Sequence, residues 1–140
     1  MLISKPNFIS KELPESETWD IFREVSADIV THSDDDIRDL HAKMTTLLAQ
    51  AEMQLGEWFS KLKSFGVKSK TTKATLLVTI YPDGPFNQRS AQVEADKRYQ
   101  DILEQEGEIE GNVEIYKAKV HALESAVELL SREISYRIKK

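Results

Sequence analysis

The position of the prolines constrains this chain more than any other feature of its sequence. All four lie at residues 6, 14, 82 and 85, so the spans 15–81 and 86–140 contain none. Because proline is the strongest helix breaker, both spans are free to form long helices. Apolar residues recur in both at steps of three and four, the period of an amphipathic helix. The sequence therefore predicts an all-α chain of elongated helices with a long C-terminal helix, about 70% helical against a usual third.

Three helices are predicted within a single helical domain over residues 14–140. They cover about 15–31, 34–64 and 88–138. The second helix follows Ser33, whose hydroxyl suits a helix N-cap, and it is expected to end near Gly66. Residues 1–13 show no steady period and are predicted to form an irregular N-terminal arm.

The segment 65–87 is predicted to be a basic loop that contains a short strand. Residues 75–81, Thr-Leu-Leu-Val-Thr-Ile-Tyr, are rich in β-branched and aromatic side chains. Residues 82–85, Pro-Asp-Gly-Pro, are typical of a turn, since proline presets φ and glycine permits a positive φ. A single strand is not stable alone. It either pairs with a strand of another subunit or is an extended loop against the helices, and both alternatives stay open.

The C-terminal helix carries a heptad pattern whose phase does not slip at Gly107 or Gly111. One helix of about 50 residues is therefore expected, with a bend at Gly111 as the alternative. The apolar stripe is wider than two positions per heptad, which indicates more than one partner helix. Packing against the second helix and a homo-oligomer seam both fit this pattern, and the two can hold together. The predicted seam residues are Val113, Tyr116, Val120, Leu123, Val127, Leu130 and Ile134.

The sequence lacks the motifs that are typical of several classes of function. The chain has no cysteine, which excludes disulfide scaffolds and thiol chemistry and fits a reducing compartment. Its three histidines have no metal-ligand spacing, and its five glycines form no phosphate loop. No run of about 18 apolar residues is present, and the first residues lack the pattern of a signal peptide. We expect a cytoplasmic protein without catalytic residues, metal, cofactor or membrane contact.

The best functional signal is a cluster of lysines in a chain whose net charge is −5. Residues 61–73 contain five lysines and no acid, whereas residues 12–39 and 94–110 are strongly acidic. Aromatic residues at 65, 81 and 86 flank the cluster and offer stacking faces. Cations with interleaved aromatic rings suit single-stranded nucleic acid, because every base has a face that can stack. The predicted nucleic-acid-binding residues are Lys61, Lys63, Lys68, Lys70 and Lys73.

The layout of residues 37–138 resembles the phage recombination-mediator family typified by UvsY. A long helix ends in a basic stretch, a polar segment follows, and a long C-terminal helix completes the chain. The local similarities are Ala95-Asp96-Lys97, Tyr116 and residues 126–132. The resemblance implies a non-enzymatic homo-oligomer in the cytoplasm of a bacterial host. It implies binding to single-stranded DNA, contact with a single-strand-binding protein and loading of a RecA-like recombinase, with the five lysines neutralising phosphates.

A second hypothesis assigns the chain to another class of function. It is then a helical scaffold or an inhibitor that acts through protein–protein contacts. Its acidic surface, centred on the first helix, is the contact surface in this interpretation.

Overall fold

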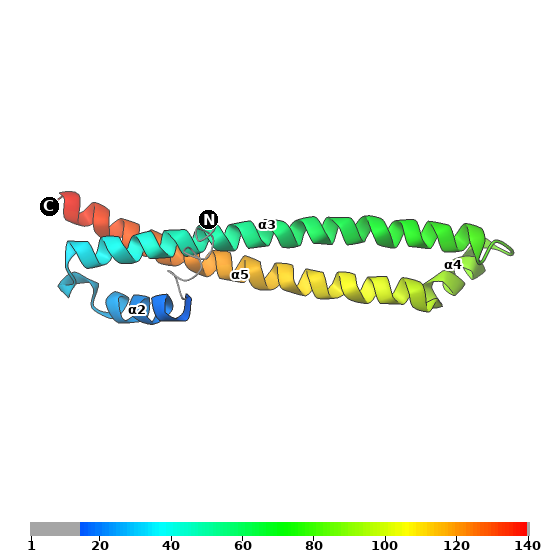
Figure 1. Ribbon diagram of the computed structural model, residues 1–140, viewed down its shortest axis with the longest axis horizontal. Helices are drawn as coiled ribbons and strands as arrows, with labels where there is room; N and C mark the ends of the chain where they lie inside the picture. Colours follow the sequence, from blue (N-terminus) through cyan, green and yellow to red (C-terminus); the bar gives the residue numbers. More distant parts are fainter. Residues whose placement is uncertain (1–14, 140) are drawn as a thin grey trace, which may run out of the picture. The chain divides into compact units, whose positions relative to one another are not determined.

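The computed structural model describes residues 15–139, and 92% of these residues are helical. The elements are α2 (Glu15–Ala27), the 3-10 helix η1 (Ile29–Thr31), α3 (Asp34–Thr79), α4 (Phe86–Ala95) and α5 (Lys97–Lys139) (Figure 1). No strand occurs in the described part of the chain. The predicted all-α class and the long C-terminal helix are confirmed, whereas the predicted arm over 1–13 lies outside the described residues.

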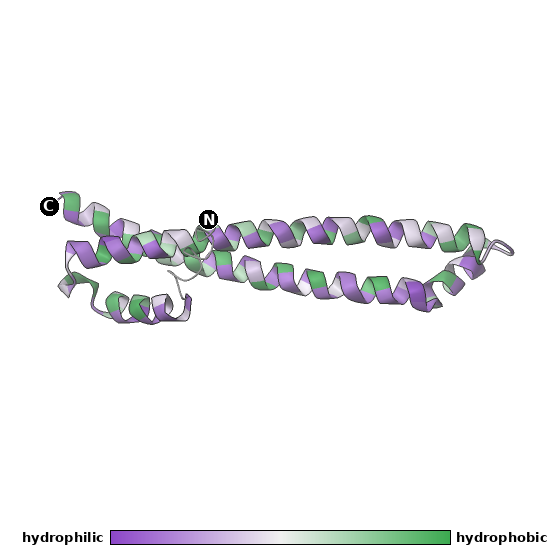
Figure 2. Ribbon diagram, viewed as in Figure 1, coloured by the Kyte–Doolittle hydropathy of each residue, from purple (hydrophilic) through white to green (hydrophobic). Residues whose placement is uncertain are grey.

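The described residues divide into two compact units, where the sequence suggested a single domain. Unit 1 contains 15–53 and 118–139, and unit 2 contains 54–117. Helices α3 and α5 each run through both units. Hydropathy alternates along the helices (Figure 2), and within residues 15–139 no helix is long and apolar enough to cross a membrane.

Unit 1 packs α2 and the N-terminal part of α3 against the C-terminal part of α5. The pairing of α3 and α5 is antiparallel, because His41 Nε2 lies 2.9 Å from Ser131 Oγ and Arg137 donates to Asp34 at 2.7 Å. Arg137 also donates to the carbonyl oxygen of Ile29, which ties η1 to α5. The buried apolar core consists of Val25, Ile37, Leu40, Met44, Leu47, Ala51, Val120, Leu123, Ala126 and Leu130.

Helix α3 starts where the sequence predicted and ends later. The Ser33 hydroxyl accepts a hydrogen bond from the backbone N–H of Asp36 at 3.1 Å, so the predicted N-cap is confirmed. The predicted end near Gly66 is wrong, as are the loop over 65–87 and the strand over 75–81, because α3 continues to Thr79. Leu76 extends the apolar stripe of the helix and is only 4% exposed. Packing against the rest of unit 2 therefore outweighs the β-propensity of this segment.

The end of α3 is fixed by the turn that the sequence predicted. Gly84 has a positive φ of 102°, which glycine adopts without strain. Arg89 of α4 donates to the carbonyl oxygens of Tyr81 and Leu77, at 2.8 and 2.7 Å. Carbonyl groups at the end of a helix lack partners within it, so this side chain stabilises the end of α3.

The predicted helix over 88–138 is two helices, because the chain breaks at Asp96. This carboxylate accepts hydrogen bonds from the backbone N–H and the guanidinium of Arg98 and from the Tyr81 hydroxyl. The hydrogen bond from Arg98, followed by that from Tyr81, holds the pKa of Asp96 well below its usual range. Asp96 thus acts as the N-terminal cap of α5.

The first predicted helix is also shorter than expected, since α2 ends at Ala27 and η1 replaces its last turn. Helix α5, by contrast, continues through Gly107 and Gly111 as its unbroken heptad phase predicted. A helix interrupted at either glycine is therefore excluded. No other side chain lies within 4 Å of the position that a Cβ atom would take at Gly111.

Replacing Gly111 with alanine is expected to raise the free energy of unfolding by about 0.5–1 kcal/mol. Alanine loses less backbone freedom than glycine when a helix forms, and the site has room for its methyl group. Urea denaturation followed by circular dichroism measures the change. Gly84→Ala is the control and is expected to lose stability, because φ is 102° there. A loss of stability in Gly111→Ala would contradict the prediction.

Candidate nucleic-acid interface

All five predicted lysines lie on α3 within unit 2. Lys61 and Lys63 lie on a helix as predicted, whereas Lys68, Lys70 and Lys73 lie on the same helix and not on the predicted loop. Lys61, Lys63, Lys68 and Lys70 are exposed, whereas Lys73 is half-buried. No acid occurs between residues 58 and 82. The helical conformation decides which of these cations share a face.

A seven-residue repeat arranges the exposed lysines in two rows. Residues 58–64 read Trp-Phe-Ser-Lys-Leu-Lys-Ser, and residues 65–71 read Phe-Gly-Val-Lys-Ser-Lys-Thr. Seven residues are close to two helical turns, so equivalent positions lie on one face about 10.5 Å apart. Lys61 and Lys68 form one row, named the ring-contact row. Lys63 and Lys70 form the other, named the open row.

The lysines of the ring-contact row lie over aromatic rings of the same helix. The Lys61 ammonium is 4.5 Å from the centre of the Trp58 ring, and the Lys68 ammonium is 5.2 Å from that of Phe65. Each cation–π contact at an exposed site is worth about 0.5–1 kcal/mol. A phosphate that recruits one of these lysines must displace it from its ring.

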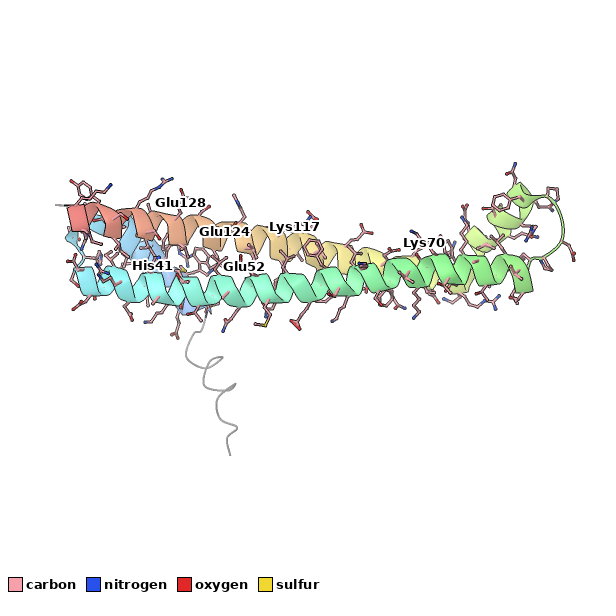
Figure 3. The ribbon with its side chains drawn as sticks, turned by 90° about the horizontal axis from the view of Figure 1, so that it is seen from above. His41, Glu52, Lys70, Lys117, Glu124 and Glu128 are labelled. Atoms are coloured by element: carbon pink, nitrogen blue, oxygen red, sulfur yellow. The ribbon has the colours of Figure 1, made fainter. Side chains whose placement is uncertain are left out.

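Within the described part of the chain, the lysines of the open row make no ring contact that a phosphate must displace. Neither Lys63 nor Lys70 makes an ion pair or a ring contact with any residue from 15 to 139. Figure 3 places Lys70 on α3 and Lys117 on α5. The two ammonium groups of the open row are therefore available to an anionic ligand.

No protein-family model, curated protein or solved structure matches this chain.

Lys73 is placed differently from the other four lysines. Its ammonium lies 3.9 Å from Glu94 of α4, and its side chain is 34% exposed. Glu94 begins the acidic stretch 94–110, and Glu106 of this stretch approaches α3 at Gly66. Unit 2 thus balances nine basic with ten acidic residues. The excess of positive charge is restricted to the lysine rows of α3.

Two further residues of this surface were missed from the sequence. Phe59 is 44% exposed and lies four residues before Lys63, at the start of the open row. The Lys117 ammonium of α5 is 5.5 Å from the Phe59 ring centre and also pairs with Glu114 at 3.2 Å. A helical reading of 58–71 would have placed Phe59 beside the open row, but nothing local in the sequence places Lys117 there.

The aromatic residues that were expected to stack on bases differ in their surroundings. Phe65 is half-buried beneath Lys68, and the Tyr81 hydroxyl donates to Asp96 at 2.7 Å. This hydrogen bond raises the pKa of Tyr81. Phe86, at the start of α4, is 62% exposed. Phe59 and Phe86 are therefore the more accessible rings in unit 2.

The residues of the predicted oligomer seam are largely covered within one chain. Val113, Val120, Leu123 and Leu130 are buried, and Tyr116, Val127 and Ile134 are half-buried. Packing against other helices of the same chain accounts for this burial. Ala122 and Leu129 of α5, seven residues apart, stay exposed. Among residues 15–139, no group of three histidine or acidic side chains is arranged to hold a metal ion.

Proposed function

We propose that this chain is a non-enzymatic protein that binds single-stranded DNA through the lysine rows of α3. The observation that carries the proposal is the repeat in residues 58–71, which gives two rows of exposed ammonium groups along opposite flanks of α3. Phosphate contacts of this kind position a strand without reading its bases. The exposed ring of Phe59 adds a stacking face beside the open row.

Single strands fit this surface better than duplex DNA. The four lysines of this helix alternate with small and apolar residues such as Ser64 and Val67, and the segment 58–74 contains no arginine, asparagine or glutamine, whose side chains make bidentate contacts with base edges in a major groove. A flexible strand can follow the rows and place bases against an aromatic ring. Binding is then independent of base sequence and strongly dependent on salt.

The proposal extends to recombination mediation, in which the protein helps to load a RecA-like recombinase and contacts a single-strand-binding protein. This step is supported by the resemblance of residues 37–138 to the recombination-mediator family. A homo-oligomer would repeat the lysine rows along one strand, so that several weak contacts act together. The buried seam residues are already used within one chain, so we place the contact between copies on the outer face of α5 that carries Ala122 and Leu129.

A titration of labelled oligothymidylate with the full chain tests the DNA-binding step. Fluorescence anisotropy should show binding at low salt, with a slope of log affinity against log salt between about −1.4 and −2.8, the values for two and for four neutralised phosphates. An oligomer with a neutral peptide backbone and the same bases is the control and should not bind. A mixed-sequence strand should bind as well as oligothymidylate. No binding of DNA at low salt would contradict the proposal.

The alternative function, a helical module that acts on protein partners, is favoured by a separate observation. Unit 1 holds thirteen acidic and seven basic residues over 15–53 and 118–139. A surface of this charge repels nucleic acid and attracts basic proteins. Under this alternative, DNA does not bind and a basic protein partner does.

A further inference from the structure

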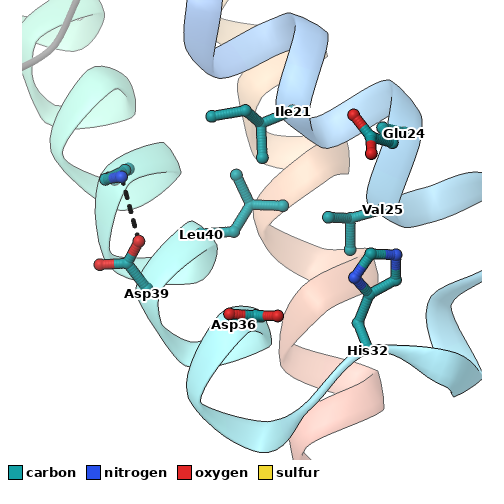
Figure 4. A pocket seen from close by; sticks show the side chains of 8 residues that line it. Ile21, Glu24, Val25, His32, Asp36, Asp39 and Leu40 are labelled. Atoms are coloured by element: carbon teal, nitrogen blue, oxygen red, sulfur yellow. Dashed lines mark ion pairs between the residues drawn. The ribbon is translucent and has the colours of Figure 1, made fainter.

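A pocket of about 280 Å³ lies in unit 1 between α2, the loop that follows η1 and the first turns of α3 (Figure 4). Val25 and Leu40, which are 5% and 2% exposed, contribute its apolar lining, and Ile21 is 43% exposed beside them. The volume is just below the range of roughly 300–1,000 Å³ that is usual for small-molecule sites. The pocket therefore has room for one or two side chains.

Charged groups surround this apolar lining, and most of them are acidic. Glu24, Asp36 and Asp39 contribute carboxylates, whereas His32 and Lys43 are the other polar residues of the lining. Lys43 pairs with Asp39 at 3.0 Å, as the dashed line in Figure 4 shows. Neither Glu24 nor Asp36 has a side-chain ion pair with any residue from 15 to 139. Two negative charges are therefore left without a cation beside an accessible apolar surface.

We propose that this pocket is a docking site for an arginine of a basic segment on a protein partner. The aliphatic stem of arginine packs on Ile21, Val25 and Leu40, and the guanidinium lies among the carboxylates of the rim. Long cationic side chains divide in this way between apolar contact and charge. Arginine is favoured over lysine because its planar head is more weakly hydrated and matches carboxylate geometry.

The charge of the rest of unit 1 identifies the partner as a protein with a basic segment. Glu17 on α2, Asp28 directly after α2 and Asp35 on α3 are exposed, whereas the exposed Asp20 of α2 pairs with Arg23. They exclude a polyanion and steer a basic segment towards the pocket. The site lies entirely in unit 1 and does not depend on the DNA-binding proposal for unit 2.

The test uses the peptide acetyl-Ala-Arg-Leu-Arg-Ala-amide and the full-length chain. Methyl NMR signals of Ile21, Val25 and Leu40 should shift and saturate, with a dissociation constant at or below about 1 mM. The same peptide with citrulline in place of arginine keeps the shape and removes the charge. It should bind at least tenfold more weakly, since a hydrogen bond between a guanidinium and a carboxylate is about twice as strong as one between neutral groups. A peptide with lysine in place of arginine should also bind more weakly.

A matched pair of variants separates the pocket from general acidity. Glu24→Gln/Asp36→Asn removes two lining carboxylates and should weaken arginine-peptide binding at least tenfold. Glu17→Gln/Asp35→Asn removes the same charge from α2 and from the first turn of α3, outside the lining, and should keep the affinity within twofold. Circular dichroism establishes that both variants fold. Equal losses in the two variants, equal binding of the citrulline or lysine peptide, or no saturation at 10 mM peptide would each overturn the proposal.

Discussion

Leu123→Ala is expected to lower the free energy of unfolding by about 2–5 kcal/mol. Leu123 is 0% exposed and lies in the core of unit 1 with Leu40, Met44 and Leu130. Truncation removes buried apolar surface and leaves a cavity that the neighbouring side chains fill only in part. Since a small protein has a net stability of about 5–15 kcal/mol, the loss is large. Urea denaturation monitored by circular dichroism measures it.

The matched control for this variant is Leu129→Ala on the same helix. Leu129 is 40% exposed, so its truncation should change the free energy of unfolding by less than about 1 kcal/mol in dilute protein. Equal losses in the two variants would contradict the assignment of the core. Protein concentration adds a second discrimination. If copies pack through the outer face of α5, the effect of Leu129→Ala increases with concentration, whereas that of Leu123→Ala is present at every concentration.

The helices were predictable because their apolar stripes are regular. Ser33 marks the start of α3, and the unbroken heptad phase correctly carries α5 through Gly107 and Gly111. The prediction was wrong at 75–81, where β-branched residues indicated a strand. A local window does not show that Leu76 continues the stripe of α3 and becomes buried, since that depends on residues distant in sequence.

The break at Asp96 was not predictable from the sequence pattern either. Ala95, Asp96 and Lys97 keep the heptad count, so the pattern alone gives no boundary there. The boundary depends on hydrogen bonds from Tyr81 and Arg98, and Tyr81 lies across the turn between α3 and α4. An aspartate is a common helix cap, but its partners are set by the fold.

The lysine cluster of the candidate site was visible in the sequence, whereas the arrangement of its side chains was visible only in the structure. The sequence pointed to all five lysines, yet the predicted loop concealed that four of them form two rows. It also concealed that Lys73 approaches Glu94 and that Lys117 approaches Phe59. These differences depend on a continuous α3 and on the helix that pairs with it. They predict that the lysines differ in how readily each binds a phosphate, and this prediction is testable.

Lys63→Ala/Lys70→Ala is expected to reduce the salt slope of single-stranded DNA binding by about 1.4, equivalent to two phosphate contacts. These two lysines have no partner among residues 15–139 that a phosphate must displace. Lys61→Ala/Lys68→Ala should reduce the slope less, because each of these lysines gives up a ring contact before it binds a phosphate. Lys73→Ala should leave the slope unchanged, since Lys73 lies beside Glu94.

Anisotropy titrations of labelled oligothymidylate between about 20 and 200 mM salt measure these slopes. The control is Lys43→Ala/Lys139→Ala, which removes the same charge from unit 1 and should keep the parent slope. Helix content should not fall in any variant, because alanine is the better helix former. If the control lowers the slope as much as the open-row variant does, binding follows net charge and the rows have no role. If the salt slope falls more in the ring-contact variant than in the open-row variant, the ring contacts do not weaken the binding of Lys61 and Lys68 to phosphate. The distinction between the rows is then wrong.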